Sequence, residues 1–182
     1  MVCILLGEGF EESEVIVPLD LMRRAGLEVA LVGLGGEEEV ISSHKVAVRT
    51  DMTIDDVHLS RTELVMIPGG MGGVAAIKHS DAAKKLILRA FEKGIYLAAI
   101  CAGPTVLAEL GLLSGRMAVC YPGMEAELGD AVVCKGKPVV SDGSIITGEA
   151  AGSSFAFGLK LIEILKGPAA AAQVKLSVHD HG

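Results

Sequence analysis

The chain has 182 residues, of which 51% are hydrophobic and 21% charged, and this composition supports one globular core rather than a disordered chain. Its 16 basic and 23 acidic residues give a net charge of −7, and aromatic residues make up only 3%, which excludes a surface built to bind nucleic acid. No segment approaches ~20 uninterrupted apolar residues, so we expect no membrane span. We predict a single domain over residues 1–182.

The cysteines and histidines show no pattern typical of a disulfide framework or a metal site. Four cysteines lie far apart and form no CxxC pair: Cys3, Cys101, Cys120 and Cys134. The opening residues MVCILL have no basic start and are too short for a signal peptide, so we expect reduced thiols in the cytoplasm. His179 and His181 belong to a polar tail that is more typical of a frayed end than of a metal chelator. We expect no metal and no cofactor.

Short apolar strands alternate with amphipathic helices along the chain. The first part predicts a strand at Met1–Leu6, a helix at Glu11–Ala25, a strand at Leu27–Val32, a hairpin or edge strands at Glu37–Ser42 and Lys45–Arg49, and a strand at Glu63–Ile67. The second part predicts a helix at Asp81–Glu92, a strand at Ile95–Ile100, a helix at Gly103–Leu110, short strands at Arg116–Cys120, Ala131–Cys134, Pro138–Ser141 and Ile145–Thr147, and helices at Ser153–Leu165 and Ala169–Val178. This order favours an α/β fold with a mostly parallel sheet covered on both faces.

Local signals set some of these boundaries and direct the search for a site. Ser80 is a good N-cap, and Pro18 should kink the first helix or delay its regular start. Ligands of such sheets bind beyond the carboxyl ends of the strands. The segments that follow Leu6, Ile67 and Ile100 are therefore the places where functional residues are expected.

Cys101 follows one of these strands and stands almost directly before an expected helix. Its neighbours Ala99, Ala102 and Gly103 are small, as a sharp strand-to-helix turn requires, and this arrangement is typical of a nucleophile elbow. The positive end of the helix dipole would favour the thiolate, which is the reactive form. The alternative is a cysteine packed as a small core residue, but the surrounding sequence favours a reactive one.

A glycine-rich segment, Pro68–Gly73, follows another buried strand. Glycine lets the backbone approach a ligand closely, so N–H groups of this segment, together with that of Ala102, are candidates to stabilise an oxyanion. A plain turn is the alternative. The segment departs from the dinucleotide-binding fingerprint because its spacing is incomplete and no acidic residue stands convincingly ~20 positions further on.

The loop after the first strand carries four carboxylates: Glu8, Glu11, Glu12 and Glu14. Most of them are explained by the dipole of the following helix and by solvation. One could still turn inward towards Cys101, where repulsion from a thiolate would raise its pKa and let it shuttle protons as a general acid and base. Spacing alone does not choose among Glu11, Glu12 and Glu14.

These motifs together resemble the ThiJ/PfpI superfamily and, within it, the DJ-1 clade. The matching stretches follow the same order over essentially the whole chain: Gly9–Glu14 with Pro18 and Asp20, Met22–Gly26, Pro68–Gly70, Ala98–Pro104, Gly152–Phe157 and Ala171–Lys175. The resemblance implies a flavodoxin-like three-layer α/β sandwich, usually a homodimer. It implies that Cys101 is the reactive, oxidation-prone nucleophile and that Glu14 is the carboxylic acid beside it. It places Gly70 and Ala102 as backbone oxyanion donors, with Gly69 and Tyr121 beside them in the substrate site.

The sequence departs from the family pattern at four places, one of which is Glu149–Gly152, where relatives show an Arg- or Gln-Gly-Pro-Gly-like turn. Tyr121 stands where close relatives often carry a histidine, and a phenol cannot replace an imidazole as a base near neutral pH. Ala102 stands where the peptidase-like branch has a histidine, so an intracellular peptidase is disfavoured. His44 falls near a position where a relative has an arginine at the dimer-facing rim, and it receives no role.

The resemblance implies a cofactor-independent glyoxalase or deglycase, which acts on methylglyoxal, glyoxal or their adducts through a cysteine thiolate and gives 2-hydroxy acids. The alternative is a redox-sensing stress protein or chaperone whose Cys101 is oxidised to a sulfinate. A third hypothesis is a non-catalytic scaffold in which the cysteine is only part of the core. The expected partners are a small 2-oxoaldehyde or glycated substrate and a second copy of the chain, with no nucleic acid and no membrane.

Overall fold

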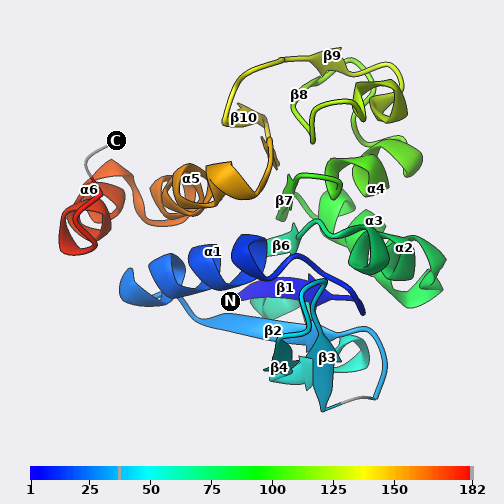
Figure 1. Ribbon diagram of the computed structural model, residues 1–182, viewed down its shortest axis with the longest axis horizontal. Helices are drawn as coiled ribbons and strands as arrows, with labels where there is room; N and C mark the ends of the chain where they lie inside the picture. The colour runs from blue at the N-terminus through cyan, green and yellow to red at the C-terminus, as the bar shows by residue number, and fades with distance from the viewer. Residues whose placement is uncertain (37, 181–182) are drawn as a thin grey trace.

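The computed structural model describes residues 1–36 and 38–180 and has a seven-stranded sheet at its centre. The strand order is β10–β11–β7–β6–β1–β2–β5, and every pairing is parallel except that of β10 with β11. The strands are β1 Val2–Leu6, β2 Val29–Gly33, β5 Met52–Thr53, β6 Leu64–Ile67, β7 Tyr96–Ile100, β10 Val139–Asp142 and β11 Ile145–Gly148. The predicted mostly parallel α/β fold is confirmed (Figure 1).

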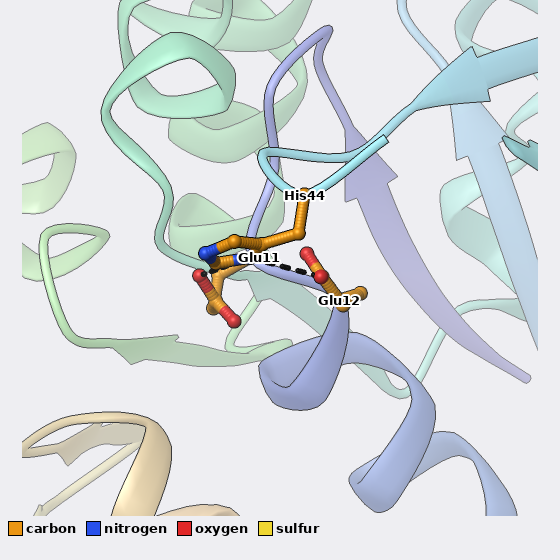
Figure 2. A group of neighbouring side chains, drawn as sticks. All are labelled: Glu11, Glu12 and His44. Carbon is orange, nitrogen blue, oxygen red and sulfur yellow. Dashed lines mark ion pairs between the residues drawn. The ribbon is translucent and has the colours of Figure 1, made fainter. Parts of the chain in front are cut away.

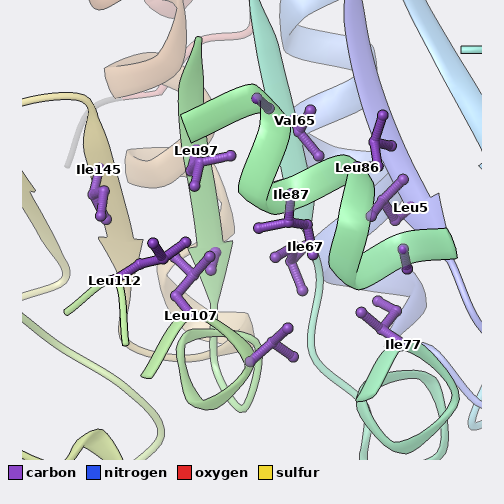
Figure 3. Close-up of a cluster of buried hydrophobic side chains, with 14 of the residues drawn as sticks. Leu5, Val65, Ile67, Ile77, Leu86, Ile87, Leu97, Leu107, Leu112 and Ile145 are labelled. Atoms are coloured by element: carbon purple, nitrogen blue, oxygen red, sulfur yellow. The ribbon is translucent and has the colours of Figure 1, made fainter. Parts of the chain in front are cut away.

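Helices cover both faces of this sheet. One core lies between the sheet and the helices α2 (Met71–His79), α3 (Asp81–Glu92) and α4 (Pro104–Glu109), and Figure 3 shows part of it. The other core lies beneath α1 (Glu12–Arg24), α5 (Ser154–Lys166) and α6 (Pro168–Ser177). Side chains of a strand alternate between its two faces, so in β1 Leu5 belongs to the first core and Ile4 to the second. None of the described helices is long and apolar enough to cross a membrane.

Among the described residues, the remaining elements are two pairs of short strands outside the main sheet and single turns of 3-10 helix. β3 (Glu39–Ile41) and β4 (Ala47–Arg49) form the expected antiparallel pair, although Glu37 of the predicted strand lies outside the described residues, as does His181 of the tail. β8 (Met117–Ala118) and β9 (Val132–Val133) form a parallel pair that is shorter than predicted. Single turns of 3-10 helix are η1 (Ile54–Asp56), η2 (Leu59–Arg61), η3 (Glu125–Leu128) and η4 (Ala151–Ser153).

Two local expectations are corrected by the structure. The helix α1 begins at Glu12 and runs through Pro18, so proline does not delay its start. The glycine-rich segment is not only a turn, because α2 begins within it at Met71, with Gly70 as its N-cap. The expected cap at the start of α3 is confirmed, since the Ser80 hydroxyl accepts a hydrogen bond from the N–H of Ala83 at 3.2 Å.

Candidate active site

Cys101 forms a strained turn at the carboxyl end of β7. Its φ of +64° lies in the left-handed region, which costs a residue with a side chain about 1–3 kcal/mol. The backbone holds it there, because its N–H donates to Gly148 O at 3.0 Å and its carbonyl accepts from the N–H of Tyr121 at 2.8 Å. A Cβ at Gly103 would lie 2.6 Å from Ile67 O, so the turn needs glycine there. The strand-to-helix elbow expected at this cysteine is present.

Glu14 lies on the first turn of α1 and is fully buried. Its Oε2 accepts a hydrogen bond of 2.7 Å from the N–H of Gly69. Its Oε1 is also buried and, among the described residues, has no hydrogen-bond partner of standard geometry. A buried carboxylate oxygen without a partner is costly, so this oxygen favours the protonated acid or a donor brought in by a ligand.

Gly69 lies against both the carboxyl group of Glu14 and the sulfur of Cys101. A Cβ at this position would lie 2.7 Å from Cys101 Cβ and 3.0 Å from Cys101 Sγ, and would contact Glu14 Oε2. The two functional side chains therefore approach each other only because residue 69 has no side chain. The backbone N–H of Gly69 is occupied by Glu14, so its contribution is to hold the carboxyl group and not to stabilise an oxyanion.

Burial raises the pKa of Glu14 from 4.5 to about 7. Interactions with the Cys101 thiol and the Gly69 N–H act in the opposite direction, but they are smaller than the effect of burial. Glu14 is thus the carboxylate of the loop that turns inward, and its pKa is raised as expected, but the cause is burial and not repulsion from a thiolate, because the interaction with Cys101 lowers this pKa. Near neutral pH this carboxyl group is close to half protonated, which suits a group that gives and takes protons.

The pKa of the Cys101 thiol is raised to about 12, first by burial and then by the charge on Glu14. The helix dipole was expected to favour the thiolate, but burial and the charge on Glu14 outweigh any such effect, so the pKa of the thiol is raised and not lowered. Two opposing contributions come from the backbone N–H groups of Ala102 and Gly70, which hydrogen-bond the sulfur and lower its pKa. Because two adjacent acids cannot both ionise cheaply, Cys101 and Glu14 behave as a pair that carries one proton and one negative charge over a wide pH range.

The sulfur of Cys101 borders a cavity of about 600 Å³. Its lining residues are Glu8, Gly9, Glu11, Ser42, Ser43, His44, Lys45, Gly70, Met71, Gly72, Cys101, Ala102, Tyr121 and Met124. Tyr121 lines this cavity with 49% of its surface exposed, as expected for a residue of a substrate site. Glu11 and Glu12, the two carboxylates that the sequence left as alternatives to Glu14, instead lie beside His44 (Figure 2), and Glu11 and His44 line the cavity.

The sequence reasoning missed two features of this site. The first is the role of Gly69, which only the approach of α1 to β7 reveals. The second is the cluster of Glu11, Glu12 and His44. His44 is 32 residues from Glu12 along the chain, but it meets the two glutamates because the β3–β4 turn folds back onto the loop before α1. The sequence pattern does not predict this contact, because the position of the turn depends on the fold.

Comparison with known proteins decides the family. The model of the DJ-1/PfpI family matches residues 1–164. The chain belongs to the DJ-1/PfpI family. Among its curated relatives is the Parkinson disease protein 7 homolog of Danio rerio, which is 37% identical over 175 residues that cover 94% of this chain and 93% of the relative.

Two further DJ-1/PfpI relatives have names that state an activity. The glutathione-independent glyoxalase DJR-1.2 of Caenorhabditis elegans is 31% identical over 91% of this chain and 88% of its own length. A protein of Pyrococcus abyssi named as a deglycase is 28% identical over 91% of this chain and 99% of its own length. Among solved structures, DJ-1beta of Drosophila melanogaster has a TM-score of 0.93 at 36% identity and covers 98% of this chain and 96% of its own. This likeness confirms the expected family fold.

Proposed function

We propose that this DJ-1/PfpI protein is a cofactor-independent glyoxalase or deglycase-type enzyme that converts methylglyoxal, glyoxal or their adducts into 2-hydroxy acids. The observation that carries the proposal is the pairing of Cys101 with the buried carboxyl of Glu14 at a cavity. The relatives named as a glutathione-independent glyoxalase and as a deglycase support this class of activity.

The first step is addition of the sulfur to the aldehyde carbon of the substrate. The thiol proton moves to the carboxylate of Glu14 as the carbon–sulfur bond forms, so no free thiolate has to accumulate. The aldehyde oxygen gains the negative charge, and the N–H groups of Gly70 and Ala102, which point at the sulfur, are placed to stabilise it. Protonation of this oxygen gives a hemithioacetal.

The second step is a proton transfer between the two former carbonyl carbons. Glu14 as carboxylate takes the proton from the carbon bonded to sulfur and returns it to the neighbouring carbon, while the hydroxyl proton of the first carbon moves to the oxygen of the second, so the first carbon becomes a thioester carbonyl and the second an alcohol carbon. Water then cleaves the thioester and regenerates the thiol. Methylglyoxal plus water gives lactate, and no external oxidant, reductant or cofactor is consumed.

The direct test is lactate formation from methylglyoxal by purified protein without glutathione. We expect turnover by the wild type and by Cys120→Ser, and no turnover by Cys101→Ser. Cys120→Ser is a matched control because it also replaces a thiol that burial makes a weak acid. Equal lactate yields from the wild type and Cys101→Ser would refute the mechanism.

A second candidate function is redox sensing through oxidation of Cys101 to a sulfinate by peroxide. It is supported by the same pair, because a protonated Glu14 can donate a hydrogen bond to a sulfinate oxygen. Intact mass after mild peroxide treatment separates the two functions. A gain of two oxygens at Cys101 in a protein that turns over no methylglyoxal supports the sensor, and no gain at that residue argues against it.

We also propose that the protein acts as a homodimer in the cytoplasm. The four cysteines, Cys3, Cys101, Cys120 and Cys134, are all free thiols, which fits a reducing compartment. The apolar side chains Ile16 and Phe155 are 42% and 47% exposed on α1 and α5, two helices that pack together, and a partner subunit would cover such residues. Light scattering gives the mass: twice 18.8 kDa supports the dimer, and a monomer at all concentrations refutes it.

A further inference from the structure

Three side chains of types that can bind a metal ion lie close together beside the Cys101 cavity, and two of them, Glu11 and His44, line it. Glu11 and Glu12 come from the start of α1, and His44 comes from the turn between β3 and β4 (Figure 2). One ligand atom of each lies within 4.8 Å of those of the other two. His44 Nδ1 is 2.9 Å from Glu12 Oε1 and 3.8 Å from Glu11 Oε2. Donor atoms that share one divalent ion have separations of this order, since each lies about 2.0–2.2 Å from the ion.

The protein backbone and a neighbouring hydroxyl hold two of these groups in place. The Ser43 hydroxyl lies 3.1 Å from Glu11 Oε2, 3.2 Å from Glu12 Oε2 and 3.1 Å from His44 Nδ1, so its single proton is shared among the members of the cluster. The N–H of Ser43 donates to Phe10 O at 2.8 Å, which fixes the turn against the loop before α1. The side chains of Glu11 and Glu12 are only about a fifth exposed, whereas His44 is 71% exposed and has room to adjust its ring.

An ion pair between a histidine and a glutamate does not balance the charge of this cluster. Even a protonated His44 neutralises only one of the two carboxylates, and a third carboxylate, that of Glu8, also lines the cavity. The lysine nearby, Lys45, is the residue after His44 and lines the same cavity, so it reduces this excess in part. A divalent cation would neutralise the charges of both Glu11 and Glu12 and would at the same time be coordinated by the imidazole nitrogen of His44.

We propose that Glu11, Glu12 and His44 form a site for a divalent transition metal, with Zn²⁺ as the expected occupant. The mixture of one imidazole nitrogen and two carboxylate oxygens suits Zn²⁺ better than Ca²⁺ or Mg²⁺, which prefer oxygen ligands alone. Three protein ligands leave a coordination position open to water or to an oxygen of a ligand in the cavity. The site is separate from the Cys101–Glu14 pair, so it stands whether or not the proposed function is correct.

The test measures metal binding rather than catalysis. Zn²⁺ binding to the purified protein is followed by calorimetry, and Co²⁺ is added as a probe whose absorption reports the ligand types. We expect one ion per chain and Co²⁺ bands without the strong charge-transfer absorption that a thiolate ligand gives. His44→Ala and Glu12→Gln should each weaken binding at least about tenfold. Thermal unfolding of each variant shows that the fold is retained.

Two controls test the cysteine of the cavity and the histidines of the tail as alternative metal ligands. Cys101→Ser removes the thiol that lines the same cavity, and the double variant His179→Ala/His181→Ala removes the histidines of the tail. Both should bind Zn²⁺ as the wild type does. Binding that survives His44→Ala, that is lost in either control, or that is absent from the wild type overturns the proposal.

Discussion

Cys101 and Cys120 lie in neighbouring regions of the molecule, yet their surroundings differ in kind. Burial raises the pKa of both thiols, to about 12 for Cys101 and to about 11 for Cys120. The sulfur of Cys120 faces the carbonyl oxygen of Tyr121 at 3.5 Å, and the charges that act on it are those of Glu125 and Glu127, opposed by that of Lys135. The sulfur of Cys101 instead faces a buried carboxyl group and two backbone N–H donors.

This difference between the surroundings of the two cysteines shows that a raised pKa does not by itself identify a functional cysteine. Around Cys120, burial and the charges of Glu125 and Glu127 disfavour ionisation. The charge of Lys135 opposes them only in part, and no buried carboxyl group of the described residues lies beside the sulfur. Cys101 has a neighbour, Glu14, that can accept its proton, and donors that can stabilise a negative charge once it forms. The feature that distinguishes the reactive cysteine is therefore a neighbouring group that can accept its proton.

The largest expected effect is on turnover. Cys101→Ser should lower kcat/KM for methylglyoxal by about 10³-fold or more, because the attacking sulfur is lost, whereas Cys120→Ser should stay within about twofold of the wild type. Steady-state lactate formation measures both. A similar loss in the two variants would remove the contrast between the two cysteines.

The second largest effect is expected on kcat when Glu14, the proposed acceptor of the thiol proton, is replaced. Glu14→Gln keeps an oxygen that can accept the hydrogen bond of the Gly69 N–H but cannot take a proton, so kcat should fall about 10²-fold or more. The exposed glutamate Glu163, which pairs with Lys160 on α5, offers a matched control in Glu163→Gln with unchanged kcat. Retained activity in Glu14→Gln would show that the buried carboxyl is only structural.

Stability should depend on pH through the same carboxyl group. The pKa of Glu14 is raised from 4.5 to about 7 in the folded state, so its contribution is fully present below pH 4.5 and is lost as pH rises through 7. Relative to Glu14→Gln, the wild type should lose about 3 kcal/mol of unfolding free energy between these limits. Urea unfolding at a series of pH values measures this difference, and parallel curves for the two proteins would contradict it.

The smallest effect tests the strained backbone. At Cys101, where φ is +64°, glycine should be more stable than alanine by about 1 kcal/mol, because only glycine adopts this conformation without cost. At Cys120, which does not have a positive φ, alanine should be the more stable of the two. Thermal unfolding of the four variants provides the comparison, and the same order at both positions would show that Cys101 is not strained.

Much of the fold follows from sequence because buried parallel strands and amphipathic helices leave strong local patterns. The strand β7, the cap of α3 at Ser80 and the elbow at Cys101 are of this kind. The helix α2 was missed altogether because its glycines favour turns. Here tertiary packing outweighs that preference, and Cβ atoms at Gly72 and Gly73 would meet the backbone of Gly9 and Phe10.

The position of Cys101 in the site could be predicted from the sequence, but the choice of the carboxylate beside it could not. The sequence brought Cys101 to the edge of the sheet, but it left Glu11, Glu12 and Glu14 open until the family resemblance pointed to Glu14. Which side chain of α1 points inward depends on how the helix is rotated against the sheet. The raised pKa of Cys101 also could not be foreseen, because the helix dipole is local whereas burial and the charge on Glu14 depend on the folded site.

The most direct test of the shared proton is the rate of Cys101 alkylation as a function of pH in the wild type and in Glu14→Gln. With the other cysteines replaced by serine, we expect the wild-type rate to rise in two steps, near pH 7 and towards pH 12, because the pair loses its two protons separately. Glu14→Gln should lack the step near pH 7. The same profile in both proteins would contradict the account.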